Sequence, residues 1–416
     1  MAFTTWLREV NPTWDVVPAS VLFAERSEKS TSDDIHLTPS QKLGVLPQDE
    51  YVERTGAQVV RNRLGAGNMK HVEAGDFISH LRSFQGGLEY SALSGKVSNA
   101  YTVLFPRKTI VDRYYRYLFK SSLFVEGLGN LTDQLRDGQT INFARFAQFG
   151  LPVPPMEKQR AIADYLDRET AEIDAMTADL DKMEALLMER RRSVIASLTS
   201  DDRWERESLR SIAAGPGGLF SDGDWVELKD QDPDGDVRLL QLADVGDGDF
   251  RDKTDKWVNK EKFSLLGCTA LREGDILIAR MPDPISRATL VPRLNYPAIT
   301  VVDVAILRLP STDDSRFIMH AINSANFRSR IEEKLVGSTR QRISRSALGR
   351  ETVPRPDLPT QRRIAEEIDC ETAEIDAMLA DITELRDLLA ERRTALIAAA
   401  VTGQIDIPTA EEPTHA

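Results

Sequence analysis

Two long stretches of the chain carry a seam of positions at alternating spacings of three and four, the heptad pattern of coiled-coil helices. The first seam consists of Ile162, Leu166, Glu169, Ile173, Met176, Leu180, Met183, Leu187, Arg190 and Val194. The second seam consists of Ile364, Ile368, Glu371, Ile375, Met378, Ile382, Leu385, Leu389, Arg392 and Leu396. Each stretch has about 42 residues, and a helix of that length spans on the order of 60 Å. The pattern predicts two long helices that pack on one another.

The second stretch is a copy of the first. The pair Gln159-Arg160, the run from Glu169 to Met176 and the triplet Glu189-Arg190-Arg191 all return, with identical residues, 202 positions later. Because the offset is constant, the chain contains an internal duplication with no net insertion.

The segment before each long helix has the short apolar runs and turn residues of a mixed α/β domain. In the first segment, the Gly75-Asp76 turn leads into a strand, a second strand spans 100–106, and a helix spans 112–124 with its aromatic residues in the core. The later segment repeats this order around Gly274-Asp275. Proline-rich joints separate each segment from its helix. We therefore predict domains at 1–150 and 203–352, conserved helices at 151–202 and 353–403, and a flexible tail at 404–416.

Four polar residues of the seams indicate how the helices pair. In an antiparallel pair, Glu169 approaches Arg392 and Glu371 approaches Arg190, whereas a parallel pair brings like charges together. The alternative is that these four residues are solvated and make no mutual contact. The predicted fold is α+β: two mixed α/β domains separated by two long helices, which pack as an antiparallel coiled coil with a pseudo-twofold internal repeat.

Composition adds limits to this fold. The chain has 416 residues, 41% of them hydrophobic, and only two cysteines, so a disulfide framework is not available. No apolar run approaches membrane-spanning length, and we expect a cytoplasmic protein without membrane contact. The formal charge is −13, but residues 353–416 alone hold six Lys or Arg against fourteen Asp or Glu. The two globular segments are close to neutral, so each can present a basic face to DNA.

The sequence contains no set of residues with catalytic spacing. It lacks the Gly-rich loop and the Asn/Asp-Pro-Pro-aromatic tetrad of methyltransferases, and it lacks a phosphate-binding loop, so we expect no cofactor. The five histidines have no metal-ligand spacing, so no metal is expected. Pro282-Asp283 and Glu332-Glu333-Lys334 suggest a nuclease pattern. That site needs its Glu and Lys on one face of a strand, whereas 317–335 is predicted to be helical.

Side chains suited to DNA gather in equivalent loops before the two proline joints. Arg and Lys bind guanine, Asn and Gln bind adenine, and hydroxyl groups contact phosphates. The loop of the second domain contributes Arg340, Gln341, Arg342, Ser344 and Arg345, and its counterpart in the first domain contributes Arg136, Gln139, Thr140, Asn142 and Arg145. Weaker candidates are Lys96 and Asn99 in the first domain and Arg280 and Arg287 in the second. The alternative is a pair of solvated loops.

The order of domain, long helix, second domain and second helix resembles the specificity subunit of type I restriction-modification systems, over nearly the whole chain. The segments Pro154 to Ile162 and Pro356 to Ile364 match that family's entry into each conserved helix, a proline followed by Gln-x-x-Ile. The two Gly-Asp turns and the stretch Ser98 to Val103 resemble its target-recognition domains. Unlike many relatives, the chain has no acidic residue directly before either glutamine.

The resemblance implies that each domain reads one half of a bipartite gapped site in double-stranded DNA. It also implies that the helices space the two halves and form the docking surface for two DNA-methyltransferase subunits, to which restriction/translocase subunits are added. The chain itself would then be non-catalytic. Two other functions remain open: the recognition subunit of a related system whose partner fuses methylase and nuclease, and a coiled-coil scaffold that binds proteins.

Overall fold

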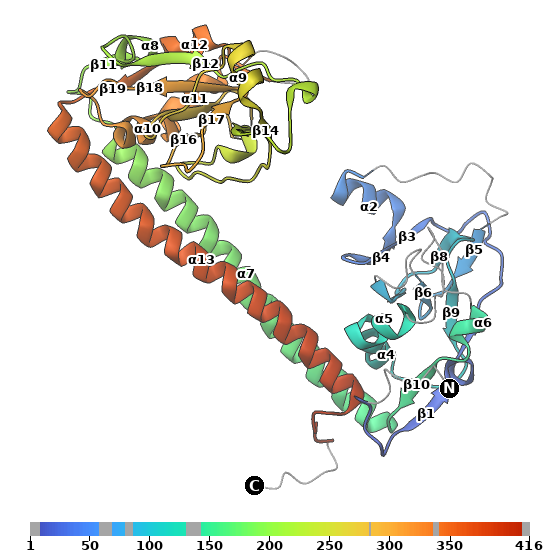
Figure 1. Cartoon of the computed structure of the whole chain (residues 1–416). Coiled ribbons are helices and arrows are strands. Elements are labelled where there is room, and N and C mark those ends of the chain that lie inside the picture. The colour runs from blue at the N-terminus through green and yellow to red at the C-terminus, as the bar shows by residue number, and fades with distance from the viewer. Residues whose placement is uncertain are drawn as a thin grey trace. The chain divides into compact units, whose positions relative to one another are not determined.

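The computed structural model describes residues 9–57, 69–79, 86–129, 143–282, 284–335 and 341–409. Its contacts divide the chain into two compact units, Met1–Leu180 with Glu384–Ala416, and Asp181–Thr383. Each unit holds one globular domain and half of each long helix (Figure 1). This division differs from one at the proline joints, because each long helix runs from one unit into the other.

A four-stranded antiparallel sheet forms the centre of the first domain, in the order β2-β9-β6-β7. Its elements are β2 (Phe23–Glu25), β6 (Phe77–Ser79), β7 (Leu88–Tyr90), β9 (Val103–Pro106), and the helices α4 (Asp112–Lys120) and α5 (Ser122–Gly129). Three of the four aromatic residues of α4 are buried as predicted, with Tyr114, Tyr115 and Phe119 all at 0% exposure, whereas Tyr117 is only half-buried. The predicted helix at 112–124 breaks at Ser121, whose backbone is extended and whose hydroxyl donates to Leu118 O at 2.7 Å.

The second domain repeats this arrangement with the strand order β12-β18-β15-β16. Its elements are β12 (Leu219–Asp222), β15 (Ile276–Ala279), β16 (Ala288–Leu290), β18 (Val304–Arg308), α10 (Ser315–Asn323) and α11 (Ala325–Glu332). The two domains therefore share one fold, although their sequences have diverged.

Smaller elements surround these sheets. In the first domain they are α1 (Ala19–Leu22), β3 (Leu37–Ser40), β4 (Gly44–Pro47), α2 (Gln48–Thr55), β5 (Met69–Val72), β8 (Gly95–Ser98) and α6 (Phe143–Phe146). In the second they are α8 (Leu209–Ile212), η3 (Leu228–Asp230), β13 (Val237–Leu240), η4 (Leu242–Asp244), β14 (Trp257–Val258), α9 (Lys260–Leu266), β17 (Ala298–Thr300) and α12 (Arg345–Arg350).

Each proline-rich joint begins as a strand that closes its own domain. Strand β10 (Gly150–Val153) pairs with the opening strand β1 (Asp15–Pro18), and β19 (Thr352–Pro354) pairs with β11 (Arg206–Ser208). The residues that lead into each long helix are thus hydrogen-bonded to the start of the preceding domain.

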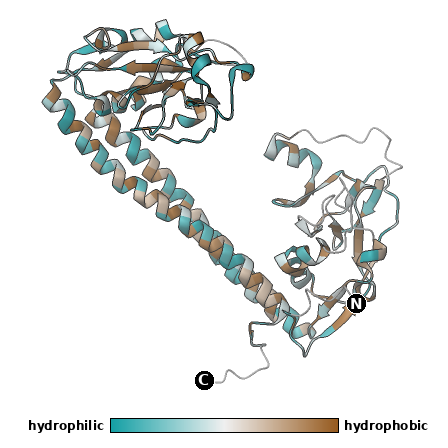
Figure 2. Cartoon of the chain, viewed as in Figure 1, coloured by the Kyte–Doolittle hydropathy of each residue, from teal (hydrophilic) through white to brown (hydrophobic). Residues whose placement is uncertain are grey.

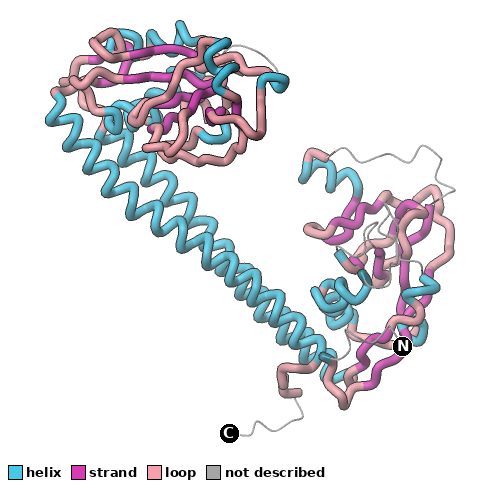
Figure 3. The backbone as a smooth tube through the Cα atoms, in the orientation of Figure 1, coloured by secondary structure: helices cyan, strands magenta, loops and turns pink. Residues whose placement is uncertain are grey.

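The predicted antiparallel helix pair is confirmed. Helix α7 (Met156–Leu198) has 43 residues and α13 (Leu358–Thr402) has 45. Figure 3 shows the two long helices side by side. In the first unit, Arg392 lies 3.5 Å from Glu169, and in the second, Arg190 lies 3.8 Å from Glu371. Stronger contacts at equivalent positions join Arg393 to Asp174 and, at 3.1 Å, Arg191 to Asp376. Among the described helices, none has the combined length and apolarity needed to cross a bilayer.

One of the two predicted rows of the seam is displaced by one residue. The row containing Ile173, Leu180, Leu187, Ile375, Ile382 and Leu389 is buried or half-buried. The predicted second row is exposed: Met176 by 43%, Met183 by 53%, Met378 by 40% and Leu385 by 48%. Its place is taken by Thr170, Thr177, Glu184, Arg191 and their counterparts Thr372, Leu379, Arg386 and Arg393.

The buried threonines explain why the hydrophobic pattern missed this row. The hydroxyl of Thr170 donates to Leu166 O at 2.7 Å, and that of Thr372 donates to Ile368 O at 2.7 Å. Each polar atom is satisfied within its own helix, so threonine can occupy a buried position. Figure 2 accordingly shows hydrophobic and hydrophilic residues interleaved along both long helices.

Candidate nucleic-acid interface and helix-pair surface

The aspartate of each Gly-Asp turn is a buried structural residue. The Asp76 carboxylate accepts a bond from Glu73 N at 2.8 Å and from Arg26 Nε and Nη2 at 2.6 and 2.9 Å. The Asp275 carboxylate accepts from Arg272 N at 2.8 Å and from Arg308 Nε and Nη2 at 2.7 and 2.6 Å. The two turns therefore have a fixed shape, maintained by a bidentate arginine.

The preceding glycines permit this turn, because Gly75 and Gly274 have φ values of 103° and 83°. The arginine comes from different strands in the two domains: Arg26 follows β2, whereas Arg308 ends β18. In the first domain, the hydrogen bond to Asp76 raises the pKa of Arg26 against the effect of burial.

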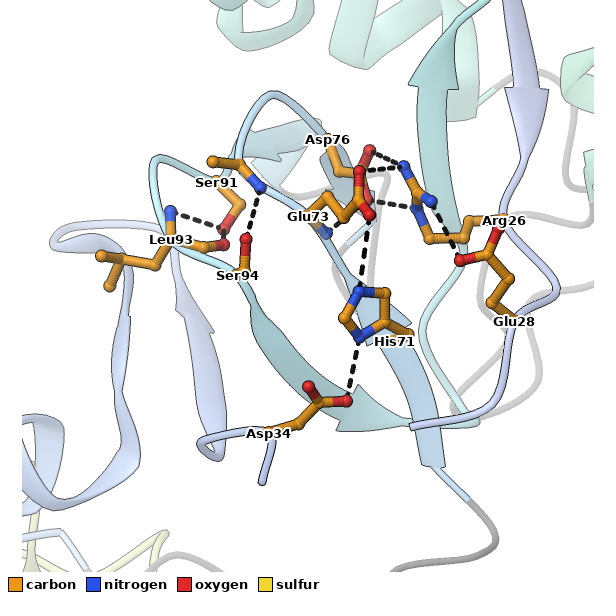
Figure 4. Close-up of polar contacts among 10 residues, drawn as sticks. Arg26, Glu28, Asp34, His71, Glu73, Asp76, Ser91, Leu93 and Ser94 are labelled. Atoms are coloured by element: carbon orange, nitrogen blue, oxygen red, sulfur yellow. Dashed lines mark hydrogen bonds and ion pairs between the residues drawn. The ribbon is translucent and has the colours of Figure 1, made fainter. Parts of the chain in front are cut away.

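A polar cluster surrounds the first of these turns (Figure 4). His71 Nδ1 lies 2.9 Å from Asp34 Oδ2, and its Nε2 lies 3.8 Å from Glu73 Oε1. Glu28, His71 and Glu73 place ligand atoms within 4.8 Å of one another and could hold a divalent cation. Arg26 already lies 3.3 Å from Glu28 and 3.5 Å from Glu73, so a guanidinium supplies positive charge there.

The predicted DNA-contacting loop of the second domain has an anchored backbone and exposed basic side chains. Ile343 is fully buried and its N–H donates to Arg280 O at 3.0 Å. Ser344 caps α12 by accepting from Ala347 N at 3.2 Å. The side chains of Arg342 and Arg345 are 43% and 50% exposed, at 3.7 Å from Asp303 and 3.8 Å from Asp222 respectively. Gln341 beside them is also exposed. This geometry suits phosphate or base contact, which stays a prediction.

Arg280 and Arg287 have a different role, because both are buried. The Arg280 side chain is 2% exposed, lies 3.1 Å from Asp222 and donates to Val302 O. Arg287 is 7% exposed and donates to the carbonyl oxygens of Val245, Leu242 and Pro284 at 2.7, 2.9 and 3.1 Å. Burial also lowers the pKa of Arg280. These contacts argue against direct DNA binding by either residue and indicate that both shape the loops around them.

Three of the seven DNA-contact candidates of the first domain, Lys96, Asn99 and Arg145, belong to the described residues. Arg136, Gln139, Thr140 and Asn142, together with Arg340 of the second domain, lie outside the described residues. Arg145 in α6 and Asn99 are exposed, which leaves them accessible to DNA. Lys96 in β8 is 4% exposed and its Nζ lies 3.5 Å from Thr31 O, so it is poorly placed for a phosphate.

The described residues do not support the nuclease pattern. Asp283 lies outside them, Glu332 ends helix α11, and Lys334 binds Glu351 at 2.5 Å. Lys334 is thus held by a buried structural carboxylate.

The glutamine of each helix-entry motif joins the helix to its domain. Gln159 is 2% exposed, accepts from Val111 N at 3.1 Å and donates to Pro154 O at 2.9 Å. Gln361 is 1% exposed, accepts from Asp314 N at 2.8 Å and donates to Pro356 O at 2.8 Å. The Gln-x-x-Ile motif therefore has a mechanical purpose, which is to fix the start of the helix against the globular domain.

A second junction was missed by sequence reasoning. Asp167 on α7 binds Arg113 and Tyr117 of α4 at 2.5 and 2.8 Å. Asp369 on α13 binds Arg316 and His320 of α10 at 3.0 and 2.7 Å. The signal was present in the sequence, since the two aspartates are 202 residues apart and both pairs of partners are 203 residues apart.

Exposed apolar residues mark one face of the helix pair. In the first unit they are Met176, Leu385 and Leu388, at 43%, 48% and 53% exposure. In the second unit they are Met378, Met183 and Leu186, at 40%, 53% and 66% exposure, whereas Met188, also exposed by 42%, has the small Ala390 as its counterpart and is not part of the repeated set. The members of the two sets are related by the 202-residue offset, and their heptad positions put them on one side of the buried seam. Large exposed apolar patches on proteins mark sites that interact with proteins, membranes or ligands.

Residues 49–185 match the family model described as the type I restriction modification DNA specificity domain. The chain is 21% identical over 240 residues to the MjaVIII type I restriction enzyme specificity subunit of Methanocaldococcus jannaschii, an alignment that covers 54% of this chain and 55% of the relative. It is 28% identical over 191 residues to the StySPI specificity subunit of Salmonella potsdam, covering 43% of this chain and 39% of the relative. The chain thus spans about half the length of these relatives, or less.

Solved structures share the fold. One is a chain from a structure of complex assembly and conformational transition of the type I R-M system, with a TM-score of 0.75, 14% identity, and coverage of 95% of this chain and 99% of that chain. Another is the HsdS subunit of Thermoanaerobacter tengcongensis, with a TM-score of 0.55, 13% identity, and coverage of 95% and 98%. The likeness extends over both domains and both long helices.

Proposed function

We propose that this chain, which belongs to the family of type I restriction-modification specificity subunits, reads a bipartite gapped DNA site and positions two DNA-methyltransferase subunits on it. The chain supplies recognition, whereas methyl transfer, cleavage and translocation belong to its partners. The observation that carries the proposal is the duplicated unit: two domains of one fold, each joined to its long helix by the same buried glutamine contacts. Such a duplication suits a target with two half-sites and a complex with two equal partners.

DNA contact in the second domain is assigned to Arg342 and Arg345, whose side chains are half exposed beside an anchored backbone. Replacing both with alanine should weaken binding of the cognate duplex by roughly 1–3 kcal/mol if the pair reads bases. If the pair neutralises phosphates, the slope of log K against log salt concentration should become shallower by about 0.9 for each arginine replaced. The assay is fluorescence anisotropy on the assembled methyltransferase at several salt concentrations.

The matched control for DNA binding is Arg210→Ala, because Arg210 is an exposed arginine elsewhere in the same unit. It should leave the affinity unchanged. Equal affinity of the wild-type and the Arg342/Arg345 variant, at every salt concentration, would remove this loop from the interface.

Partner docking is assigned to the two apolar sets on the helix pair. Met176→Glu with Leu385→Glu should release one methyltransferase subunit, and Met378→Glu with Met183→Glu should release the other. In each case, native mass spectrometry should show one subunit bound in place of two. Ala178→Glu, at an exposed position away from the apolar face, should retain both. Retention of two subunits by both double variants would refute docking at this face.

The function as a whole is tested by methylome sequencing of cells that carry this chain and its methyltransferase. The expected result is methylation of a single gapped motif, which disappears when this chain is deleted. A continuous motif, or methylation that persists without the chain, would contradict the proposal.

A further inference from the structure

The first unit contains a cavity of about 830 Å³ between its globular domain and the C-terminal part of α13. Residues that line it include Leu88 on β7, Arg116 and Lys120 on α4, Val125 on α5, and Arg393 on α13. Its volume lies within the range of roughly 300–1,000 Å³ that is typical of ligand pockets. The cavity is therefore large enough to take part of another molecule.

The corresponding place in the second unit is filled by the chain itself. Strand β16, helix α10 and the end of α7 put Ala288, Asn323 and Arg191 where the first unit has Leu88, Lys120 and Arg393. Gly248 N donates to Ala288 O at 2.9 Å. A Cβ on Gly248 would lie 3.5 Å from Arg191 Nη2 and 4.0 Å from Asn323 Nδ2. The turn around Gly248 thus occupies the space that is open in the first unit.

The turn that fills this space is acidic. Its Asp247 binds Arg328, with Nη1 to Oδ2 at 3.0 Å. Arg328 on α11 corresponds to Val125 on α5, because the two helices are 203 residues apart. Arg287 holds the base of the turn through its bond to Val245 O. The second unit therefore shows which chemistry this place in the fold accepts: a glycine-containing turn with a carboxylate that meets a cation.

The open cavity of the first unit presents a cation for such a carboxylate. The Arg116 guanidinium stacks 4.7 Å above the Tyr90 ring, and no ion pair is found for it among the described residues. Lys120 beside it binds Glu89. A guanidinium stacked on an aromatic ring keeps its N–H groups free for a bidentate carboxylate.

From these observations we infer that the cavity of the first unit is the docking site for an acidic turn of a protein subunit in the assembled complex. The inference rests on the proposed function, which supplies such partner subunits. A carboxylate turn is favoured over DNA because the second unit fills the same space with an acidic turn of protein.

A photo-crosslinking amino acid at position 125 of the full chain, in a complex reconstituted from purified methyltransferase subunits and this chain, tests the inference. The expected product is a cross-link to an Asp- or Glu-containing turn of a methyltransferase subunit. The matched control is the same amino acid at position 328, where Asp247 occupies the site and only a cross-link within this chain is expected. A cross-link from position 125 to bound DNA, or no intermolecular product, would overturn the inference.

Charge variants supply a second measurement. Arg116→Glu should weaken association with the methyltransferase about tenfold or more, Arg116→Lys should retain most of the affinity, and Val125→Arg should strengthen it. Lys108→Glu, at an exposed position outside the cavity, should have no effect. If the charge variants have no effect while the apolar-face variants still release methyltransferase, this docking site is wrong and the proposed function stands. If neither set affects assembly, the proposed docking itself has failed.

Discussion

Replacing Gln361 with alanine tests whether the helix-entry motif holds the second domain to its helix. Gln361 is 1% exposed, and its side chain makes three hydrogen bonds, to Asp314 N at 2.8 Å, Pro356 O at 2.8 Å and Asp313 Oδ1 at 3.2 Å. Alanine removes all three and leaves a main-chain donor and acceptor unpaired where water has little access.

The expected cost follows from those contacts. Each net hydrogen bond contributes roughly 0.5–1.5 kcal/mol, and a buried donor left unpaired costs about 1–3 kcal/mol. We therefore expect Gln361→Ala to lower the free energy of unfolding of the second unit by about 3 kcal/mol. Gln159→Ala should cost about 2 kcal/mol in the first unit, because Gln159 makes two such bonds, to Val111 N and Pro154 O.

Urea unfolding gives the free energies, and hydrogen exchange reports the local contact. The amide of Asp314 should lose protection in the Gln361 variant, and the amide of Val111 should lose it in the Gln159 variant. Gln148→Ala, at an exposed position, should change stability by less than about 0.5 kcal/mol. Unaltered exchange at Asp314, or a destabilisation no larger than that of the control, would refute the idea that Gln361 holds the second domain to its helix.

Four further substitutions test other contacts of the same structure. Asp275→Asn should destabilise the second unit by roughly 3–5 kcal/mol, measured by urea unfolding, because it leaves Arg308 without its buried carboxylate partner. Ile375→Ala should lower the free energy of unfolding by about 2–5 kcal/mol, since Ile375 is 1% exposed. Met378→Ala should lower it by less than about 1 kcal/mol, because Met378 is 40% exposed. Equal losses would show that Met378 is buried in the seam, as the hydrophobic pattern predicts. The hydrogen bond from His320 lowers the pKa of Asp369 below its usual value of 3.8. The ionised Asp369 therefore stabilises the folded protein above pH 3.8, and this contribution is lost as the pH falls through the lowered pKa. Asp369→Asn should therefore flatten the acid limb of the pH–stability profile below about pH 4.

The two long helices, their duplication and their antiparallel pairing could be predicted, because each depends on a pattern of residue spacing that is visible in the sequence. The heptad spacing gave the helices, the constant offset gave the duplication, and the polar residues Glu169 and Arg190 gave the antiparallel direction. The second row of the seam could not be predicted from hydrophobicity, because Thr170 and Thr372 satisfy their hydroxyls within the helix.

The helix breaks at Ser121 and Ser324 were missed for a related reason. Both serines lie between apolar turns that look continuous in sequence, and Ser324 then caps the next helix by accepting from Phe327 N at 3.3 Å. The local side-chain bond outweighs the helical pattern at that position.

The candidate DNA site could be predicted only in part, because the sequence shows which side chains are charged but not which of them are buried. Arg342 and Arg345 are half exposed as expected, but Arg280 and Arg287 are buried. The Arg287 guanidinium donates hydrogen bonds to three main-chain carbonyl oxygens. One of these, Val245 O, is 42 residues away in sequence. No motif marks a main-chain acceptor supplied by a distant loop.

The packing of the two units gives a physical reason why the two long helices have stayed similar in sequence while the two domains have diverged. The N-terminal half of α7 packs on the first domain through Ile162 and Leu166, and its C-terminal half contributes Ile195 to the core of the second. Helix α13 does the reverse, with Ile364 in the second core and Val401 in the first. Each helix must therefore fit two cores and an antiparallel copy of itself, so most substitutions disturb several contacts at once. The exposed side chains of the loop at 341–345, such as Arg342 and Arg345, pack against no core, so they can change at less cost to the fold.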